Sequence, residues 1–252
     1  MLKQFGTIVI STTLLFPFFS NASDNGNQKN QSFNKAKKML ERQVYTDVPR
    51  RTIYCHADFN SKKKITDHNG FTSKKHVKRQ TKLEWEHVVP AENFGRSFSE
   101  WREGNSACVN SKGKNFKGRR CAEKVNIAYR YMQADMYNLY PAIGAVNALR
   151  SNYNFASSIT AERNQFGRCP IKIKNKTVQP PNYAKGQIAR AYLYMEAAYP
   201  AYNIGRQKRE LLAWDKQYPV TRIECRRTQL IESLQGNENG IVKSACLARG
   251  FW

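Results

Sequence analysis

Apolar and polar residues alternate along "LEWEHVV", residues 83–89, and this alternation predicts a β-strand. Leu83 and Trp85 share a parity with His87, whereas Glu86 falls on the other parity. Successive side chains of a regular strand point to opposite faces, so Glu86 and His87 would not then serve one site. A site shared by this pair therefore requires the strand to be interrupted.

Helical periodicity dominates the rest of the chain. Apolar residues recurring at intervals of three and four predict helices over 123–136, 186–199, 206–218 and 221–236. The last of these opens with a capping box from Thr221 to Glu224 and stops at Gly236. Ile171 and Ile173 alternate with lysines, which predicts a half-buried strand with a cationic outer face.

A further helix is predicted within "NLYPAIGAVNALRSN", residues 138–152, because Pro141 suits a first helical turn. Gly144, Asn147 and Arg150 recur there on roughly one face. Glycine and asparagine are poor residues for a helix interior. The face therefore indicates a site where Gly144 permits close approach, Asn147 offers an amide oxygen and Arg150 a cation. Taken alone, the pattern fits a helix with a solvated polar face better, and that alternative stays open.

Positive charge is concentrated in two stretches. Asn69-Gly70 marks a tight turn between the strand-like segments 51–59 and 83–89, which predicts a long β-hairpin arm with a basic tip. The arm carries Lys62, Lys63, Lys64, Lys74, Lys75, Lys78, Arg79 and Lys82. A second loop, between two cysteines, carries Lys112, Lys114, Lys117, Arg119 and Arg120. Binding to a phosphate backbone needs clustered cations of this kind, and the two stretches flank Glu86-His87.

The whole chain is strongly basic, with 42 Lys and Arg against 19 Asp and Glu and a net charge of +23. A protein with this charge is expected to bind a polyanion, which can be nucleic acid, anionic lipid or acidic polysaccharide. Charge alone does not choose among them, and a role in solubility only is a further alternative.

Residues 1–22 have the composition of a secretory signal peptide, with one lysine, an apolar run and a small-residue end at Ala22. The apolar run of about 15 residues is short for a transmembrane helix, which needs roughly 20. We therefore expect cleavage near Ala22 and a periplasmic or secreted protein that does not enter the membrane. The remaining chain is expected to have a disordered lead-in over 23–34 and a single domain over 35–252.

Six cysteines, an even number without a C-x-x-C pair, favour disulfides over a zinc site. They are Cys55, Cys108, Cys121, Cys169, Cys225 and Cys246. Cys108 with Cys121 and Cys225 with Cys246 would close local loops, which leaves Cys55 for Cys169. Sequence alone leaves other pairings open.

Five motifs occur in the order "EWEHVVPAENFG", "GRRCAEK", "ADMYNLYPAIGAVNALRSN", "RAYLYM" and "WDKQYPVT". In these motifs, over nearly the whole mature chain, the protein resembles the endonuclease I family of exported bacterial nucleases. The resemblance implies an α+β fold with a ββα-metal core. In such a core, two antiparallel strands lead into a loop and a helix that hold one divalent metal, and the general base lies at the end of the second strand. The resemblance also implies that the strand breaks at Glu86-His87, as Pro90 allows.

The family motif assigns roles to individual residues. Glu86 and Asn147 are the expected metal ligands, and His87 is the expected general base. Asn138 is expected to help hold the base and the metal loop in place. Arg119 is expected to contact the phosphate.

The chain departs from the family at Gln133 and Ala145, where members commonly carry an acidic residue. Neither position is a ligand by the motif, so the metal site is unaffected. Further nucleic-acid contacts are expected from Lys74, Lys75, Arg79, Arg120 and Arg150.

One carboxylate and one amide oxygen form a hard, sparse ligand set, which suits Mg²⁺ with several waters and also admits Mn²⁺ or Ca²⁺. Histidine can be a neutral base near pH 7. We therefore expect a monomeric, Mg-dependent endonuclease that needs no small-molecule cofactor. It is expected to hydrolyse DNA and RNA with little sequence specificity and to leave 5′-phosphate ends.

Two other classes of function explain part of the sequence. A cationic polyanion-binding protein without catalysis accounts for the charge but leaves the Glu86-His87 motif unexplained. A metal-free secreted ribonuclease would use paired histidines, and only His87 lies in a convincing motif.

Overall fold

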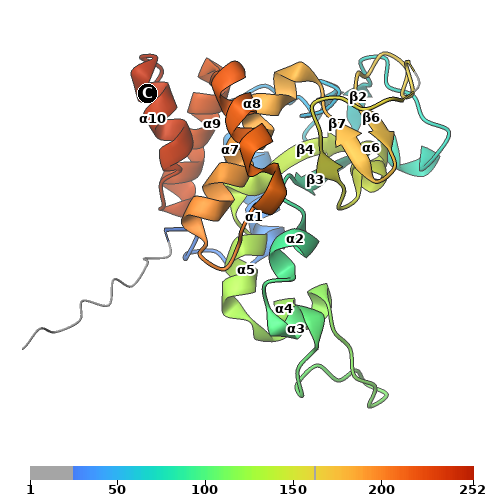
Figure 1. Cartoon of the computed structure of the whole chain (residues 1–252), viewed down its shortest axis with the longest axis vertical. Coiled ribbons are helices and arrows are strands. Elements are labelled where there is room, and N and C mark those ends of the chain that lie inside the picture. The colour runs from blue at the N-terminus through green and yellow to red at the C-terminus, as the bar shows by residue number, and fades with distance from the viewer. Residues whose placement is uncertain (1–24, 162) are drawn as a thin grey trace, which may run out of the picture.

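The computed structural model describes residues 25–161 and 163–252, so the predicted signal peptide lies outside the described residues. Within these ranges the chain contains both helices and small sheets, which confirms the expected α+β class. Figure 1 shows a large body, in which C-terminal helices are layered beside a short central sheet, and a small lobe that projects from it.

The centre of the body is a two-stranded antiparallel sheet made of β3 (Leu83–His87) and β4 (Leu139–Ile143). Nearly all residues of both strands are buried, and α6 (Gly144–Arg150) follows β4 directly. The three elements form the ββα unit that the resemblance implied. His87 pairs with Leu139 and ends the first strand of this unit, so the expectation that the base ends the second strand is wrong.

Pro141 lies in strand β4, and the prediction that it occupies the first turn of a helix is wrong. It pairs with Trp85, and its carbonyl accepts a hydrogen bond of 2.9 Å from Ile53 N. The run Leu139–Ile143 is buried throughout, and a short apolar run of this kind forms a strand when a partner strand is available. The helix therefore begins three residues later, at Gly144.

The long basic hairpin arm is absent from the described residues. Instead β1 (Asp58–Phe59) pairs with β2 (Ile65–Asp67), and β3 pairs with β4. Asn69 and Gly70 adopt the left-handed conformation of a turn, with φ of 48° and 74°, but they lie in a loop that leads to the short 3-10 helix η2 (Val77–Arg79). The apolar strand β4 supplies β3 with a fully buried partner, which the turn-rich segment before β1 does not.

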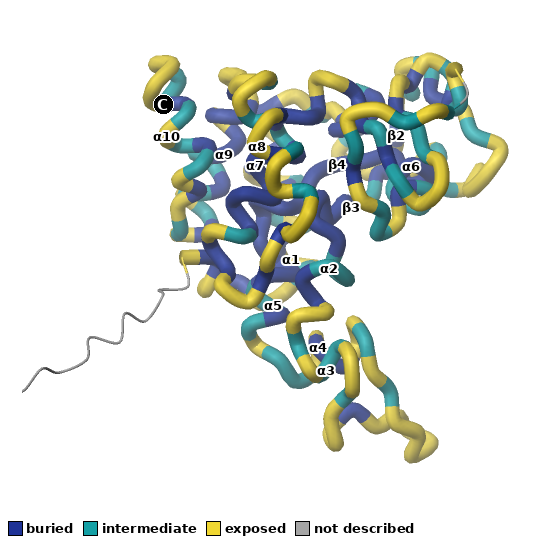
Figure 2. The backbone as a smooth tube through the Cα atoms, viewed as in Figure 1, coloured by how far each residue is buried: buried dark blue, intermediate teal, exposed yellow. Residues whose placement is uncertain are grey.

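The C-terminal helices form a layer beside the sheet (Figure 1). They are α7 (Asn182–Ala198), α8 (Lys208–Gln217), α9 (Arg222–Gln235) and α10 (Gly240–Ala248). Helix α7 is buried along most of its length, as the dark blue tube of Figure 2 shows. Helix α9 is capped as predicted, because Thr221 Oγ1 accepts a hydrogen bond from Glu224 N and Gly236 ends the helix with φ of 82°.

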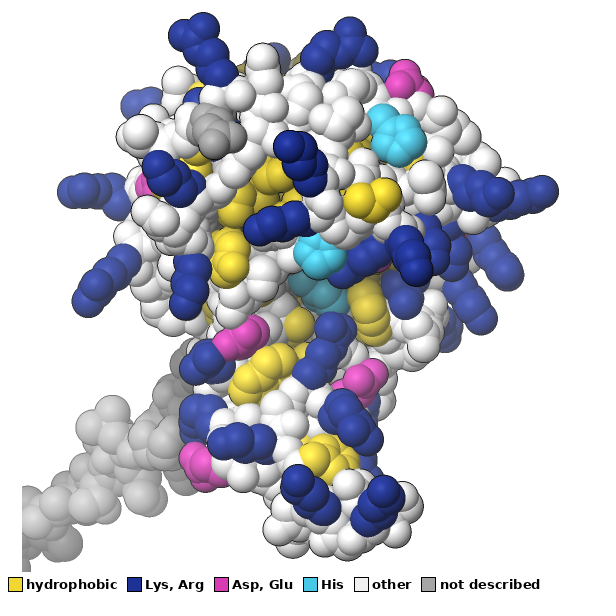
Figure 3. All heavy atoms as spheres, turned by 90° about the vertical axis from the view of Figure 1, so that its right-hand side faces the viewer, with side chains coloured by type: hydrophobic (Ala, Val, Ile, Leu, Met, Phe, Trp, Pro, Cys, Tyr) yellow, Lys and Arg dark blue, Asp and Glu magenta, His cyan; other side chains and the backbone are white. Residues whose placement is uncertain are grey.

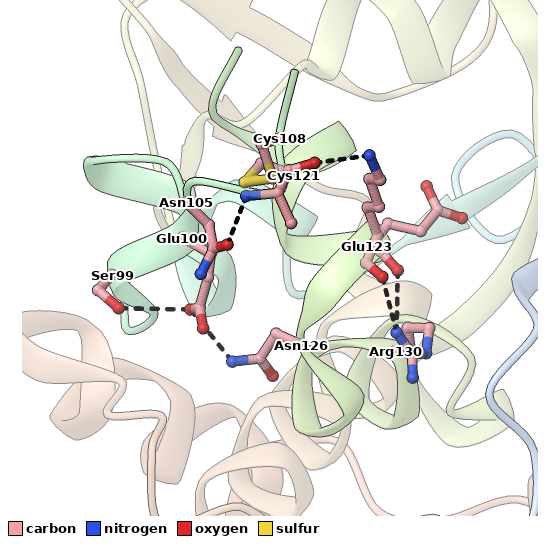
Figure 4. Close-up of a disulfide and its surroundings, with 10 residues drawn as sticks. Ser99, Glu100, Asn105, Cys108, Cys121, Glu123, Asn126 and Arg130 are labelled. Carbon is pink, nitrogen blue, oxygen red and sulfur yellow. Dashed lines mark hydrogen bonds between the residues drawn. A yellow bond between two sulfur atoms is a disulfide. The ribbon is translucent and has the colours of Figure 1, made fainter. Parts of the chain in front are cut away.

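The small lobe consists of short helices and one long loop. The helices are α2 (Ala91–Gly95), α3 (Ser99–Arg102), α4 (Arg119–Val125) and α5 (Ile127–Gln133). The single helix predicted over 123–136 is broken at Asn126, whose side chain caps α5 by accepting a hydrogen bond of 2.8 Å from Tyr129 N. Figure 4 shows this side chain donating to Glu100 beside the disulfide that closes the basic loop.

The remaining elements are short. They are α1 (Phe33–Met39), η1 (Leu40–Val44), η3 (Met136–Asn138), β5 (Asn154–Phe155), β6 (Lys172–Lys174), β7 (Thr177–Gln179) and η4 (Gly205–Gln207). Strand β7 lies between β5 and β6 in a three-stranded sheet and is parallel to β5. A helix long and apolar enough to cross a membrane is not found among the described residues.

The six cysteines pair as expected. The disulfides are Cys55–Cys169, Cys108–Cys121 and Cys225–Cys246, so no cysteine is free. The first of them joins segments that are 114 residues apart in the chain, and the other two close local loops.

The segment before α1 differs from the disordered lead-in expected over 23–34. Asn27 is fully buried, and its side chain donates a hydrogen bond of 2.9 Å to Tyr131 O. Its backbone N–H donates to the Tyr199 hydroxyl at 2.8 Å. The described part of this segment is therefore packed against the domain.

Candidate active site

A cavity of about 570 Å³ opens where β3 ends, between the body and the small lobe. Its polar lining includes Glu84, Glu86, His87, Arg119 and Asn147. Figure 3 shows a hollow across the middle of this face, with a histidine side chain inside it and lysine and arginine side chains around its rim. The structure thus brings together four of the five residues to which the family motif gives a role.

Glu86 and His87 meet at this cavity although strand β3 is regular. The strand stays paired with β4 through both residues, so the predicted break at Glu86-His87 is wrong. All five residues of β3 line the cavity, which therefore follows the strand edge that β4 leaves free. At an edge, side chains from both faces of a strand can reach the same space.

The Glu86 carboxylate is held by one of its two oxygens. Oε1 accepts a hydrogen bond from the Tyr54 hydroxyl at 2.8 Å and forms an ion pair with Arg150 Nη1 at 3.0 Å. Burial raises the pKa of Glu86, and the Arg150 cation and the Tyr54 hydroxyl oppose that rise. No hydrogen bond to Oε2 is found among the described residues, so this oxygen is left for a ligand in the cavity.

The Asn147 amide is likewise held through one of its two polar atoms, in this case the nitrogen. Nδ2 donates a hydrogen bond of 2.9 Å to Glu84 Oε2. A carboxylate can only accept, so the amide oxygen Oδ1 must face the other way. Gly144 makes room for this contact, because a Cβ at that position would lie 2.6 Å from Glu84 Oε1. The close approach predicted at Gly144 is therefore made by a carboxylate.

The two free oxygens fit a hard divalent cation. Glu86 Oε2 and Asn147 Oδ1 are a carboxylate and an amide oxygen, which are ligands that Mg²⁺ and Ca²⁺ prefer. Both side chains line one cavity, and each is fixed through its other polar atom. Over the described ranges, no group of three or more His, Cys, Asp and Glu is arranged to hold a metal. The proposed donor set in the cavity thus contains one carboxylate oxygen and one amide oxygen.

His87 presents one free ring nitrogen. Its Nε2 lies 2.8 Å from Gln133 O and must donate to that carbonyl, which makes Nδ1 the acceptor nitrogen of a neutral ring. Burial and then the Arg119 cation lower the pKa of His87 to about 3. The imidazole is therefore neutral at pH 7.

Asn138 lies behind the cavity and does not line it. The residue is fully buried, and its side-chain amide forms both possible hydrogen bonds with the backbone of Val89, at 2.7 and 3.0 Å. This pairing fixes the chain immediately after His87. The holding role expected of Asn138 stays a prediction.

Three cations line the cavity: Arg119, Lys37 and Lys63. Arg119 begins α4, and its Nε donates a hydrogen bond of 2.8 Å to Gln133 Oε1. Burial, and then Lys63 and Arg119, lower the pKa of Lys37. Positive charges that disfavour one another in this way would be relieved by a bound phosphate.

The structure places Arg150 out of reach of a nucleic acid, whereas the contact predicted for Arg79, whose side chain is 39% exposed, stays a prediction. Arg150 is fully buried and donates to His87 O at 3.0 Å and Val88 O at 2.6 Å, so it cannot reach a nucleic acid. Arg79 is paired with Glu84, to which its Nε donates at 2.8 Å. The sequence pattern places Arg150 on a polar face but cannot show that this face is covered.

The other predicted contacts are exposed but lie outside the cavity. Lys74 and Lys75 are in the loop before η2, and Arg120 lies over the Phe116 ring, 4.8 Å from its centroid. None of these three cations lines the cavity.

Sequence reasoning missed three residues of the site: Tyr54, Glu84 and Lys37. Glu84 is two residues before Glu86 on β3 and therefore points to the same face, so the strand pattern could have identified Glu84 as a site residue. Tyr54 and Lys37 reach the site from distant segments, and nothing in the local pattern marks them.

Fold and site together define the class: a disulfide-bonded α+β protein built on a ββα unit, with a carboxylate, an imidazole and an amide facing one cation-lined cavity. The chain belongs to the endonuclease I family, whose model matches residues 20–246. This confirms the resemblance that the five sequence motifs suggested.

Named relatives agree with the family. The chain is 38% identical over 226 residues to a periplasmic deoxyribonuclease of Aeromonas hydrophila, covering 87% of this chain and 88% of the relative. It is 39% identical over 223 residues to an extracellular deoxyribonuclease of the same species, covering 86% and 91%. It is 36% identical over 252 residues to endonuclease-1 of Buchnera aphidicola subsp. Baizongia pistaciae, covering 96% and 94%.

Proposed function

We propose that the protein is an exported, Mg²⁺-dependent endonuclease that hydrolyses phosphodiester bonds of DNA and RNA with little sequence specificity. One observation carries the proposal: the free Nδ1 of His87 and two free oxygens, Glu86 Oε2 and Asn147 Oδ1, face one cavity lined by cations. The names of the deoxyribonuclease relatives support DNA as a substrate.

His87 is the general base of this mechanism. Its Nδ1 takes a proton from a water molecule, and the oxygen of that water attacks phosphorus opposite the leaving 3′ oxygen. The bond from phosphorus to the 3′ oxygen breaks, so the phosphate stays on the 5′ end. The carbonyl of Gln133 holds the ring in the tautomer that leaves Nδ1 unprotonated.

Glu86 and Asn147 hold the divalent cation. A Mg²⁺ ion bound there, or Mn²⁺ or Ca²⁺ in the same place, would stabilise the charge that develops on the phosphoryl group and the leaving oxygen. The hydrogen bond from Tyr54 and the ion pair with Arg150 at Glu86 Oε1 keep Oε2 directed at the cavity.

Arg119 is the phosphate contact. Its Nε is held by Gln133, which leaves the remaining guanidinium N–H groups to donate to phosphate oxygens. Contacts to phosphate carry no sequence information, and this explains the expected lack of specificity.

A periplasmic or extracellular location is proposed from the signal peptide expected before Ala22. Relatives named periplasmic and extracellular deoxyribonucleases are consistent with it. We propose that the protein acts as a monomer.

The test is cleavage of supercoiled plasmid and of a transcribed RNA, each with Mg²⁺ and with excess EDTA. We expect nicking and linearisation with Mg²⁺, loss of both with EDTA, and ends that ligate without prior phosphorylation because they carry 5′ phosphates. Binding without cleavage would favour a non-catalytic polyanion-binding protein. RNA cleavage that persists in EDTA would favour a metal-free ribonuclease.

A further inference from the structure

Glu84 lines the cavity and has no part in the mechanism above. Glu84 lies between Arg79 and Asn147 and touches both. We propose that the Arg79–Glu84 ion pair is a positioning unit, which dictates that the Asn147 amide turns its oxygen to the cavity and thereby sets the affinity for the divalent cation. The inference rests on the proposed function, because it takes Asn147 as a ligand.

A side-chain amide has two ends of nearly the same shape. Rotation of the Asn147 amide by half a turn exchanges Oδ1 and Nδ2, which occupy nearly the same space. Only one orientation presents an oxygen to a cation, and the other presents N–H groups that repel it. Glu84 Oε2 accepts from Asn147 Nδ2 at 2.9 Å, and an ionised carboxylate cannot donate to the reversed amide. Glu84 therefore selects the orientation that can bind metal.

Glu84 is itself fixed from two sides. Arg79 donates to both carboxylate oxygens, with Nε 2.8 Å from Oε1 and Nη2 bonded to Oε2. Such a fork fixes the plane of the carboxylate as well as its position. The Gly144 backbone lies directly against the carboxylate, where any side chain would collide with it.

The cavity carries a second trio of an arginine, a glutamate and an asparagine that serves as a control. Glu92 also lines the cavity, accepts hydrogen bonds from Arg96, and accepts from Asn152 Nδ2 at 2.7 Å. The trio has the same charges, but Nε and Nη2 of Arg96 both donate to Glu92 Oε1, so it lacks the fork onto two oxygens that Arg79 makes. It does not touch Asn147, so its variants report the effect of charge alone.

The decisive variant is Arg79→Gln, because an effect of charge alone and an effect of positioning predict opposite changes in the affinity for the divalent cation. If charge alone matters, removing a cation near the cavity tightens binding of a divalent ion. If Arg79 positions Glu84, its removal frees the carboxylate and weakens binding, by about 10- to 100-fold as for other partners that orient a metal ligand. Arg79→Lys keeps the charge but loses the fork, and should weaken binding by a smaller factor.

The experiment is calorimetric titration of Mn²⁺, and separately of Mg²⁺, into the mature protein without nucleic acid. Wild type is compared with R79Q, R79K, R96Q and N147A, and each melting temperature is measured to confirm folding. We expect R79Q to bind the cation more weakly than wild type, and R96Q to bind it as tightly or more tightly. N147A removes the amide ligand itself and should show the largest loss of cation affinity. Plasmid cleavage by R79Q should recover at high Mn²⁺, which a merely unfolded variant would not show.

Binding by R79Q that equals or exceeds that of wild type overturns the inference, and so does equal weakening in R79Q and R96Q. In both cases EDTA-sensitive cleavage by the wild type leaves the proposed function standing. Absence of cation binding by the wild type overturns the metal site and the inference together. Should R79Q fail to fold, R79K decides between the two explanations. It keeps the positive charge, so an effect of charge alone predicts unchanged cation affinity, whereas positioning predicts weaker binding.

Discussion

The cavity has two walls that are built in different ways. The catalytic wall, made by β3 and α6, carries Glu86 and His87, which are 2% and 8% exposed and are held by hydrogen bonds. The basic wall carries Lys37, Lys63 and Arg119, whose side chains come from α1, the loop after β1 and the small lobe, and the Lys63 side chain is 54% exposed.

The difference suits the two tasks proposed for these walls, which are catalysis and binding of a polyanion. Proton transfer and cation binding need atoms fixed within tenths of an ångström, and burial with hydrogen bonds provides that precision. Binding a long, mobile polyanion needs summed charge, which flexible side chains at a surface supply. Variants on the catalytic wall should therefore change turnover, and variants on the basic wall should change affinity, with Arg119 as the exception between them.

The largest effect is expected from His87→Ala, on the catalytic wall. Loss of the base should reduce plasmid cleavage by about 10²–10⁴-fold. DNA affinity should stay the same, because the neutral ring contributes to the transition state and not to phosphate binding. Initial cleavage rates and fluorescence anisotropy measure the two quantities.

His76→Ala is the matched control, since His76 is exposed in the loop before η2. It should cleave at the wild-type rate. Near-normal turnover of the His87 variant at saturating Mg²⁺ would remove His87 from the mechanism.

Arg119→Ala tests whether the two walls are separate. Arg119 lies on the basic wall, but Gln133 fixes its guanidinium beside His87. We expect turnover to fall by about 10²-fold, as for other charge-stabilising donors, with a smaller change in affinity. Lysine at this position should restore activity only in part, because it lacks the fork.

Arg120→Ala is the control for this prediction, because Arg120 is the next residue of α4 and does not line the cavity. It should alter affinity and salt dependence alone. If the two variants behave alike, Arg119 is only one more surface cation.

The same contrast explains what sequence can predict. Strand β3 and the cap of α9 are predictable because the information lies in a short pattern, and the disulfides follow the pairing favoured by short spacing, although the sequence left other pairings open. The motif identifies Glu86, His87 and Asn147, and these residues do converge. The sequence does not reveal that β4, and not the segment before β1, pairs with β3, because that choice depends on which buried surfaces fit.

Arg150 and Arg79 show the limit for charged residues. The sequence assigns each to nucleic acid because a cation on a polar face of a basic protein is normally exposed. In the structure Arg150 is buried against Glu86, and Arg79 is bound by Glu84. Both carboxylates lie on β3, and each pairing is a tertiary contact that periodicity does not encode.

The Cys108–Cys121 disulfide should matter for the basic wall in particular. Cys121 lies in α4 two residues after Arg119, and the bond closes the loop that precedes this helix. C108S/C121S should lower stability by about 2–4 kcal/mol, which a melting curve measures, and should also reduce turnover by displacing Arg119.

C225S/C246S is the matched control, because that disulfide joins α9 to α10 and neither helix lines the cavity. It should lower the melting temperature to a similar extent and leave turnover at the permissive temperature unchanged. Equal losses of turnover in both variants would show that stability alone is at work. Thiol titration of the denatured, unreduced wild type should find no free thiol.

The smallest effect is expected from the exposed loop before η2. Lys74 and Lys75 are exposed and lie outside the cavity, so K74Q/K75Q should weaken DNA binding only by reducing summed charge. The slope of log K against log salt should become shallower by about 0.9 for each phosphate that the protein no longer neutralises, and turnover at saturating DNA should not change. R209Q/K216Q removes the same charge from α8, which does not line the cavity, and should leave the slope unaltered. A fall in turnover for K74Q/K75Q would place this loop in the catalytic machinery, and equal slopes for the two variants would mean that DNA does not follow it.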